Sequence, residues 1–271
     1  MLKFLTKAII FLGVVVGAIT FVYLYDLYQE IKDDIDSVVN YNPKQSTQFF
    51  DKNGKLLANT FKDENREYVN YDDIPARVIE GLVAIEDTQF FEHFGVNPDA
   101  ISRAVIKNIQ SGGYSEGAST LTQQLIKVLL LSREKKIIRK VKEALLAIRL
   151  ETVLTKEEIL ERYLNHVYFG HGYYGVKTAA KGYFKKNLYE LTLKEIAILV
   201  GLPRAPSFYD PTKNLQVSLA RANQVITRMH TLGWINNEQF EESINETPTI
   251  YNQTLTQNIA PYAIDYAVSE L

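Results

Sequence analysis

The chain has 271 residues, of which 46% are hydrophobic and 23% charged, with a formal net charge of −2. This composition supplies one substantial hydrophobic core, excludes a disordered chain, and argues against bulk nucleic acid as the partner. The chain has no cysteine, which excludes disulfides, thiolate metal sites and a cysteine nucleophile.

The N-terminal segment predicts a membrane anchor. No charged residue occurs from Ala8 to Tyr25, which is close to the length of a spanning helix. Lys3 and Lys7 precede this stretch and acidic residues follow it, so the positive-inside rule places the N-terminus in the cytoplasm and the rest outside. The alternative is a cleavable signal peptide, but no small-x-small cleavage pattern follows the apolar core. We therefore predict a cytoplasmic tip and anchor at residues 1–25.

The segment after the anchor is polar and acidic. Residues 26–45 are expected to form a stalk that continues the anchor helix until Asn42-Pro43. From Gln48 to Leu57, an Asn53-Gly54 turn signal lies between two apolar stretches, which predicts a small β-hairpin as the main strand element.

The rest of the chain predicts helices joined by short loops, so the fold class is mostly α. A helix over 74–85 should begin at Asp72 or Asp73, and Ser119 is the expected cap of a helix that runs to Leu131. Thr155 and Thr192 begin capping boxes. Other helices are expected over 98–110, 134–154 and 214–232, with a glycine-rich loop at 111–117.

The first group of candidate site residues follows the helix over 74–85. Glu86 is the last to leave its apolar face, and Asp87, Phe90 and His93 come directly after it. A carboxylate held against apolar and aromatic neighbours loses solvation, which raises its pKa and makes it a candidate general base. A helix end followed by a charged loop is the alternative for an isolated Glu-Asp pair.

Two further groups follow along the chain. Hydroxyls, amides and an ammonium crowd a helix start, where exposed backbone N–H groups favour a phosphate or a sugar. Arg139 and Glu143 share a helix face, either as a surface ion pair or as a second active-site carboxylate beside a guanidinium. The helix-start group comprises Ser119, Thr120, Gln123, Gln124 and Lys127.

Together these groups resemble the peptidoglycan glycosyltransferase family, glycosyltransferase family 51. This domain occurs in class A penicillin-binding proteins and in monofunctional transglycosylases. Val128 departs from the asparagine of many relatives, and Arg204 stands where lysine is frequent. The resemblance covers about residues 70–235 and rests, in order, on Glu86-Asp-x-x-Phe90-x-x-His93-x-Gly95, Gly117-x-Ser119-Thr120-x-Thr122-Gln123-Gln124, Arg139-x-x-x-Glu143 and Glu161-Arg-Tyr163-Leu-Asn165-x-x-Tyr168-Phe-Gly170.

The resemblance implies a lysozyme-like helical fold and a reaction that joins lipid II units into β-1,4 glycan strands with release of undecaprenyl diphosphate. It implies that Glu86 is the general base of an inverting displacement, and that Glu143 lies near the diphosphate with Lys127, Arg139 and Arg204. The other helix-start and helix-end side chains are expected to bind substrate. A divalent cation, Mg²⁺ or Mn²⁺, is expected with Glu143 as its protein ligand.

The resemblance also predicts the setting of the enzyme. We expect a single-pass protein of the bacterial cytoplasmic (inner) membrane whose partners are lipid II, the growing lipid-linked strand and other cell-wall synthesis and division proteins. The glycosyltransferase domain is expected at 46–245, and residues 246–271 resemble a linker toward a transpeptidase domain. The chain lacks the complete set of Ser-x-x-Lys, Ser-x-Asn and Lys-Thr-Gly motifs, so no cross-linking activity is predicted for it.

Two other functions remain open at this point. A lysozyme or lytic transglycosylase also uses carboxylates in a lysozyme-like fold, but cleavage of glycan needs neither an anchor nor diphosphate-binding cations. A non-catalytic cell-wall scaffold would not need both glutamates.

Overall fold

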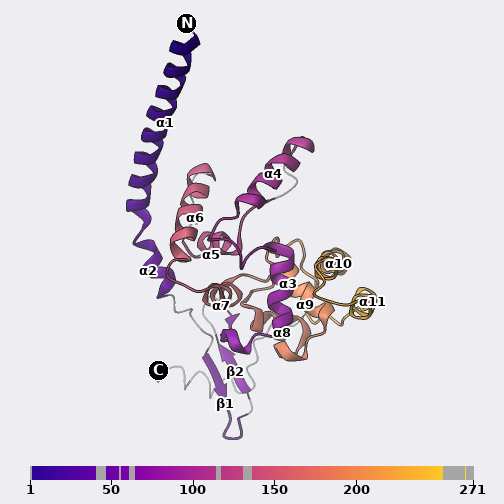
Figure 1. The fold of residues 1–271 in the computed structure, drawn as a ribbon. Helices are drawn as coiled ribbons and strands as arrows, with labels where there is room; N and C mark the ends of the chain where they lie inside the picture. The colour runs from indigo at the N-terminus through magenta and orange to yellow at the C-terminus, as the bar shows by residue number, and fades with distance from the viewer. Residues whose placement is uncertain are drawn as a thin grey trace. The chain divides into compact units, whose positions relative to one another are not determined.

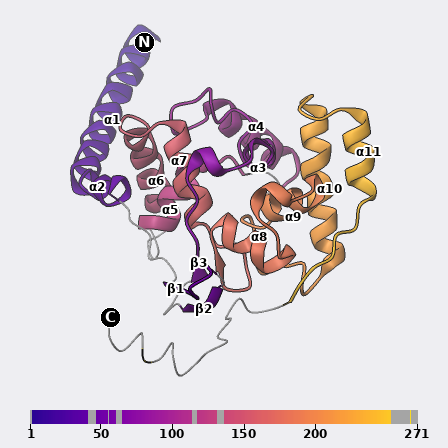
Figure 2. The same ribbon diagram turned by 90° about the horizontal axis from the view of Figure 1, so that it is seen from below.

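The computed structural model describes residues 2–40, 47–54, 56–60, 65–113, 117–130, 136–252 and 266. The chain forms two compact units: residues 1–41 with 94–154, and residues 42–93 with 155–271. The ribbon views show both as mostly helical, which confirms the predicted fold class (Figures 1 and 2).

The first unit begins with α1 (Leu2–Ile31). Within it, Ile9–Ile31 is long and apolar enough to cross a membrane, and none of its most apolar window is buried. The sequence analysis predicted that this helix continues to Asn42, and the structure shows that this prediction is wrong. The helix ends at Ile31, and after a turn at residues 32–33 a short helix α2 (Asp34–Val39) follows.

The end of α1 and the whole of α2 belong to the core of this unit. Leu27, Ile31, Ile35 and Val38 recur at three- and four-residue spacing and are each at most 7% exposed. Helix α1 contacts α6 (Lys136–Leu150), and α2 contacts both α6 and α5 (Leu121–Leu130). We call residues 27–39 the collar. It is a packed element and not the free stalk that the acidic composition suggested.

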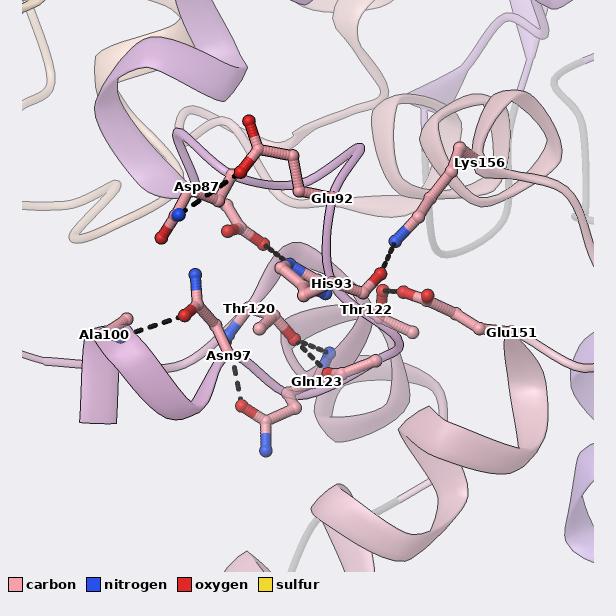
Figure 3. Close-up of polar contacts among 12 residues, drawn as sticks. Asp87, Glu92, His93, Asn97, Ala100, Thr120, Thr122, Gln123, Glu151 and Lys156 are labelled. Atoms are coloured by element: carbon pink, nitrogen blue, oxygen red, sulfur yellow. Dashed lines mark hydrogen bonds and ion pairs between the residues drawn. The ribbon is translucent and has the colours of Figure 1, made fainter. Parts of the chain in front are cut away.

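Helix α4 (Pro98–Gln110) has the predicted bounds, because the Asn97 side chain accepts a hydrogen bond from the Ala100 amide at 2.9 Å. Helix α5 is capped by Thr120 and not by Ser119: the Thr120 hydroxyl accepts from the Gln123 amide, and the Gln123 side chain accepts from the Thr120 amide, both at 3.1 Å. The capping Thr120 is drawn in Figure 3. Of the predicted 111–117 loop, residues 114–116 lie outside the described residues, as does Glu134, the expected start of α6.

The second unit contains the predicted hairpin. Strands β1 (Thr47–Phe50) and β2 (Leu56–Thr60) pair antiparallel, with Gly54 at φ +80° in the turn. A further short pair is parallel, β3 (Asn65–Arg66) with β4 (Tyr173–Tyr174).

The core of the second unit is built on α3 (Ala76–Glu86), α9 (Leu193–Gly201) and α10 (Leu215–Thr231), which contact one another. Their buried residues include Leu82, Leu199 and Val225, each 0% exposed. The predicted cap of α3 is wrong: Asp72 and Asp73 lie in a separate 3₁₀ turn, η1 (Tyr71–Asp73). Pro75 disfavours helical backbone at the residue before it, and Ile74 is accordingly extended, with φ −92° and ψ 121°, so the helix begins only after Pro75.

The other helices complete this unit. Helix α7 (Lys156–His166) and α9 begin with the capping boxes predicted at Thr155 and Thr192, and Asn214 caps α10. Helix α11 (Asn237–Asn245) packs on α10, as both ribbon views show (Figures 1 and 2). The remaining elements are α8 (Val176–Phe184) and the 3₁₀ turn η2 (Leu188–Glu190).

One contact between α7 and the chain before α3 positions the site. The Asn165 side chain accepts from the Val69 amide at 2.8 Å and donates to the Val69 carbonyl at 2.7 Å. The Glu161 carboxylate accepts from the Tyr71 amide at 2.6 Å. These two members of the fourth motif therefore bind the backbone that leads into α3, which explains their four-residue spacing structurally.

Candidate active site

Glu86 is the last residue of α3, as the sequence predicted, and its side chain is only 8% exposed. Its Oε1 accepts a hydrogen bond from Nη2 of Arg221 on α10 at 3.0 Å. Burial raises the pKa of the Tyr163 phenol on α7, and the charge of Glu86 raises it further. A buried guanidinium therefore faces the predicted base and favours its ionised form. This effect opposes the desolvation that was expected from the sequence.

Sequence reasoning missed Arg221, although a signal was present. Ser218, Ala222, Val225 and Met229 form the buried stripe of α10 at helical spacing, and Arg221 lies on that same face. A guanidinium on an apolar helix face is buried only with a partner. That partner is Glu86, 135 residues away in the sequence.

The three residues predicted beside Glu86 form a packed turn. The Asp87 carboxylate and the His93 Nε2 are 2.9 Å apart, with 4% and 5% of their side chains exposed. Phe90 is fully buried, and the Lys156 ammonium lies 4.4 Å from its ring centre while donating to the His93 carbonyl at 2.8 Å. Figure 3 shows the His93 contacts with Asp87 and Lys156. The geometry gives these side chains a role in shaping the turn after Glu86, and their contact with substrate stays a prediction.

Glu143 on α6 is buried, with 2% of its side chain exposed, so it is not half of a surface ion pair. The Lys140 Nζ lies 2.6 Å from its Oε2, and the Arg139 Nε lies 3.3 Å from its Oε1. Lys140 also donates to the Ser119 hydroxyl at 2.8 Å. The structure thus connects the second and third predicted groups through Lys140, which the sequence reasoning passed over although it lies three residues from Glu143.

The other helix-start residues divide into buried and accessible ones. The Thr120 hydroxyl donates to the Gly95 carbonyl at 2.6 Å, and both Thr120 and Gln123 are at most 3% exposed, with their polar groups used in the α5 cap. Gln124 is half-buried, and Lys127 is exposed. Lys140 and Arg139, the two cations paired with Glu143, have side chains that are 50% and 27% exposed and therefore supply accessible positive charge beside it.

Arg204 follows α9 in the second unit and is exposed. Burial lowers the pKa of the Arg221 guanidinium, which the Glu86 charge opposes and the Arg204 charge reinforces. Arg204 is therefore within electrostatic reach of the Glu86–Arg221 pair. That Glu86 and Glu143 face one cleft stays a prediction, because they lie in different units.

The carboxylates also bear on the predicted metal ion. Both oxygens of Glu143 face a cationic side chain. In the described part of the chain, no group of three or more His, Asp or Glu could hold a metal ion. A resident ion held by protein ligands alone therefore does not fit at Glu143.

Glu86 and Glu143 are thus both buried carboxylates that lie beside cationic side chains. A family model described as Transglycosylase matches residues 53–230, and the chain belongs to this family.

Curated relatives agree. The chain is 42% identical over 241 residues to penicillin-binding protein 1A of Aquifex aeolicus, which covers 88% of this chain and 33% of the relative. It is 41% identical over 226 residues to penicillin-binding protein 1A of Escherichia coli, covering 82% and 26%. A crystal structure of penicillin-binding protein 1A from Haemophilus influenzae aligns with a TM-score of 0.48 at 27% identity, covering 84% of this chain and 24% of that one. The chain thus spans about a third or less of these proteins and corresponds to their transglycosylase part.

Proposed function

We propose that this chain polymerises lipid II into β-1,4 glycan strands with release of undecaprenyl diphosphate. The carrying observation is Glu86, a carboxylate at the end of α3 inside the matched family region, with its direction fixed by Arg221 at 3.0 Å. In the proposed inverting displacement, Glu86 takes the proton of the acceptor sugar hydroxyl as that oxygen attacks the anomeric carbon of the donor.

The Glu143 group is proposed to serve the leaving diphosphate. Glu143 carries one negative charge and is flanked by two positive ones, so the group has an excess of positive charge with ammonium and guanidinium donors that reach solvent. Such donors stabilise the charge that develops on phosphate oxygens. We assign Glu143 the task of orienting Arg139 and Lys140, while Ser119, Lys127 and Arg204 are proposed as further contacts to the substrate.

A Mg²⁺ or Mn²⁺ ion is retained in this proposal only as a companion of the substrate's diphosphate, whose oxygens suit a hard cation. The membrane setting is proposed in the predicted orientation, with the N-terminus cytoplasmic and the catalytic units outside. An anchored enzyme suits a lipid-linked substrate, because both are then confined to one membrane surface.

The test is Glu86→Gln in a polymerisation assay with lipid II in vesicles or detergent. We expect a loss of about 10²–10⁴-fold in polymer formation, the usual cost of removing a general base, with substrate binding retained. Glu80→Gln is the matched control, since Glu80 lies on the same helix with 37% of its side chain exposed and pairs with the half-buried Arg77 at 2.8 Å.

Two outcomes would contradict the proposal. Near-normal polymerisation by Glu86→Gln would remove the assigned base. Release of short fragments from purified glycan strands, with no polymer from lipid II, would assign the chain to the glycan-cleaving alternative.

A further inference from the structure

The contacts of Arg221 give it one defined position in the second unit. Its side chain is 7% exposed, its Nη2 donates to Glu86 and its Nη1 donates to the Gln224 amide oxygen at 3.1 Å. The guanidinium carbon lies 5.6 Å from the centre of the Tyr209 ring. Because these three contacts fix the position of the guanidinium, the guanidinium can in turn fix the orientation of the Glu86 carboxylate.

Gly201, the last residue of α9, supplies the room for this arrangement. A Cβ at Gly201 would lie 2.9 Å from the Arg221 Cγ, closer than real Cβ contacts. The φ of Gly201 is not in the left-handed region, so its backbone does not call for glycine. Glycine is needed here because a Cβ would clash with the Arg221 Cγ. This atom is close to the backbone of α10 and cannot move away as easily as the end of a flexible side chain could.

The charges around the pair come from several elements. Two side chains interact electrostatically with Glu86: the Arg221 guanidinium, on α10, and the Tyr163 phenol, on α7. Arg221 also interacts electrostatically with Arg204 and Tyr209. Tyr163 is neutral at ordinary pH, as a phenol normally is, and burial raises its pKa further. The Arg221 guanidinium lies 3.0 Å from the Glu86 carboxylate, in a place where little solvent screens the two charges.

We propose that Arg221 is a positioning residue that keeps Glu86 ionised and correctly oriented, and that Gly201 is required because it seats Arg221. This inference rests on the proposed function, in which Glu86 is the general base. It extends the site to α9 and α10, helices that contain none of the residues predicted from the sequence to be catalytic.

The inference makes a prediction about pH that a purely structural role does not make. Without the guanidinium, the Glu86 carboxyl would hold its proton at a higher pH, so the base would be lost earlier as the pH falls. The acid limb of the activity profile of Arg221→Gln should therefore move up by about 1–3 pH units, the usual effect of an adjacent opposite charge. A structural defect would lower the rate at every pH and leave the limb in place.

The experiment compares four variants of the whole chain by their pH–rate profiles with lipid II. Arg221→Gln should show the full shift and Arg221→Lys, which keeps the charge, a smaller one. Gly201→Ala should shift the limb in the same direction, since it displaces the Arg221 stem. Arg228→Gln is the matched control on α10, because Arg228 is exposed and donates to the Thr88 hydroxyl at 3.2 Å; its profile should stay unchanged.

A second readout separates this inference from the proposed function. The carbon-13 NMR titration of the Glu86 carboxyl reports its protonation without any turnover, and it should shift upward in Arg221→Gln and Gly201→Ala. If Arg221→Gln does not fold, Gly201→Ala and Arg221→Lys decide. Unshifted titration and an unshifted acid limb in the folded variants would overturn the role of Arg221. A wild-type chain that titrates as expected but forms no polymer would overturn the proposed function alone.

Discussion

Removal of residues 1–40 is expected to unfold the first unit, whereas removal of residues 1–25 is not. The difference lies in the collar, where Leu27, Ile31, Ile35 and Val38 are buried. Each such side chain contributes about 1.5–3 kcal/mol, so the collar contributes roughly 6–12 kcal/mol as an upper bound. This is comparable with the whole stability of a typical domain, about 5–15 kcal/mol.

Hydrogen exchange in detergent measures this difference directly. The amides of α5 and α6 should keep their protection after the shorter truncation and lose it after the longer one. Trp234, the single tryptophan of the chain, lies in the second unit, so its emission tests whether that unit stays folded. A point version compares Ile35→Ala, expected to cost about 2–5 kcal/mol, with the exposed Asp36→Ala, expected within about 0.5 kcal/mol. Equal protection in both truncations would refute the packing argument.

Three further predictions concern single residues. Glu143→Gln should lower polymer formation about 10²-fold or more, because the Arg139 and Lys140 side chains lose the carboxylate that orients them. If added Mg²⁺ does not reduce this defect, the predicted role of a divalent cation is contradicted. Gly95→Ala should destabilise the first unit by more than about 2 kcal/mol in urea unfolding, since its φ is +76° and its Cβ would lie 2.5 Å from the Ala147 backbone; Gly112→Ala, with φ +65° and open space, should show the strain alone. Burial lowers the pKa of His166 from 6.5 to about 4, so this histidine takes up a proton at a higher pH in the unfolded chain than in the folded one. The free energy of unfolding should therefore fall by about 2 kcal/mol as the pH drops from about 6.5 to 4, and His166→Gln should flatten that dependence.

The features predicted correctly from the sequence are those specified locally. Asn97-Pro98, Thr155 and Thr192 each begin a helix where the capping pattern predicts it, because a cap needs only the next three residues. The Asn53-Gly54 turn is local in the same way, since a glycine with positive φ closes the hairpin. Glu86 at the end of α3 was also correct, because the loss of apolar periodicity is visible in a short window.

The features that were wrong or missed depend on distant parts of the chain. The collar was predicted to be a stalk from its acidic residues, but its four apolar residues pack against α5 and α6, which lie about a hundred residues later. Ser119 and Thr120 are equally good caps by type, and the choice falls on Thr120 because its hydroxyl also reaches the Gly95 carbonyl. Such selections need the tertiary structure.

Glu86 and Glu143 differ in the cations that they contact, and this difference favours separate roles for the two carboxylates. Glu86 and the buried Arg221 guanidinium form an ion pair of no net charge, and a proton taken up by Glu86 in the proposed reaction would remove the negative charge that faces Arg221 until that proton is passed on. That cost favours rapid release of the proton, as a base that must act repeatedly requires. Glu143 instead lies between two partly exposed cations and leaves an excess positive charge. A carboxylate so placed is suited to orienting cations toward an anion and not to accepting a proton, which is why we assign the proton to Glu86 and the diphosphate to the cations around Glu143.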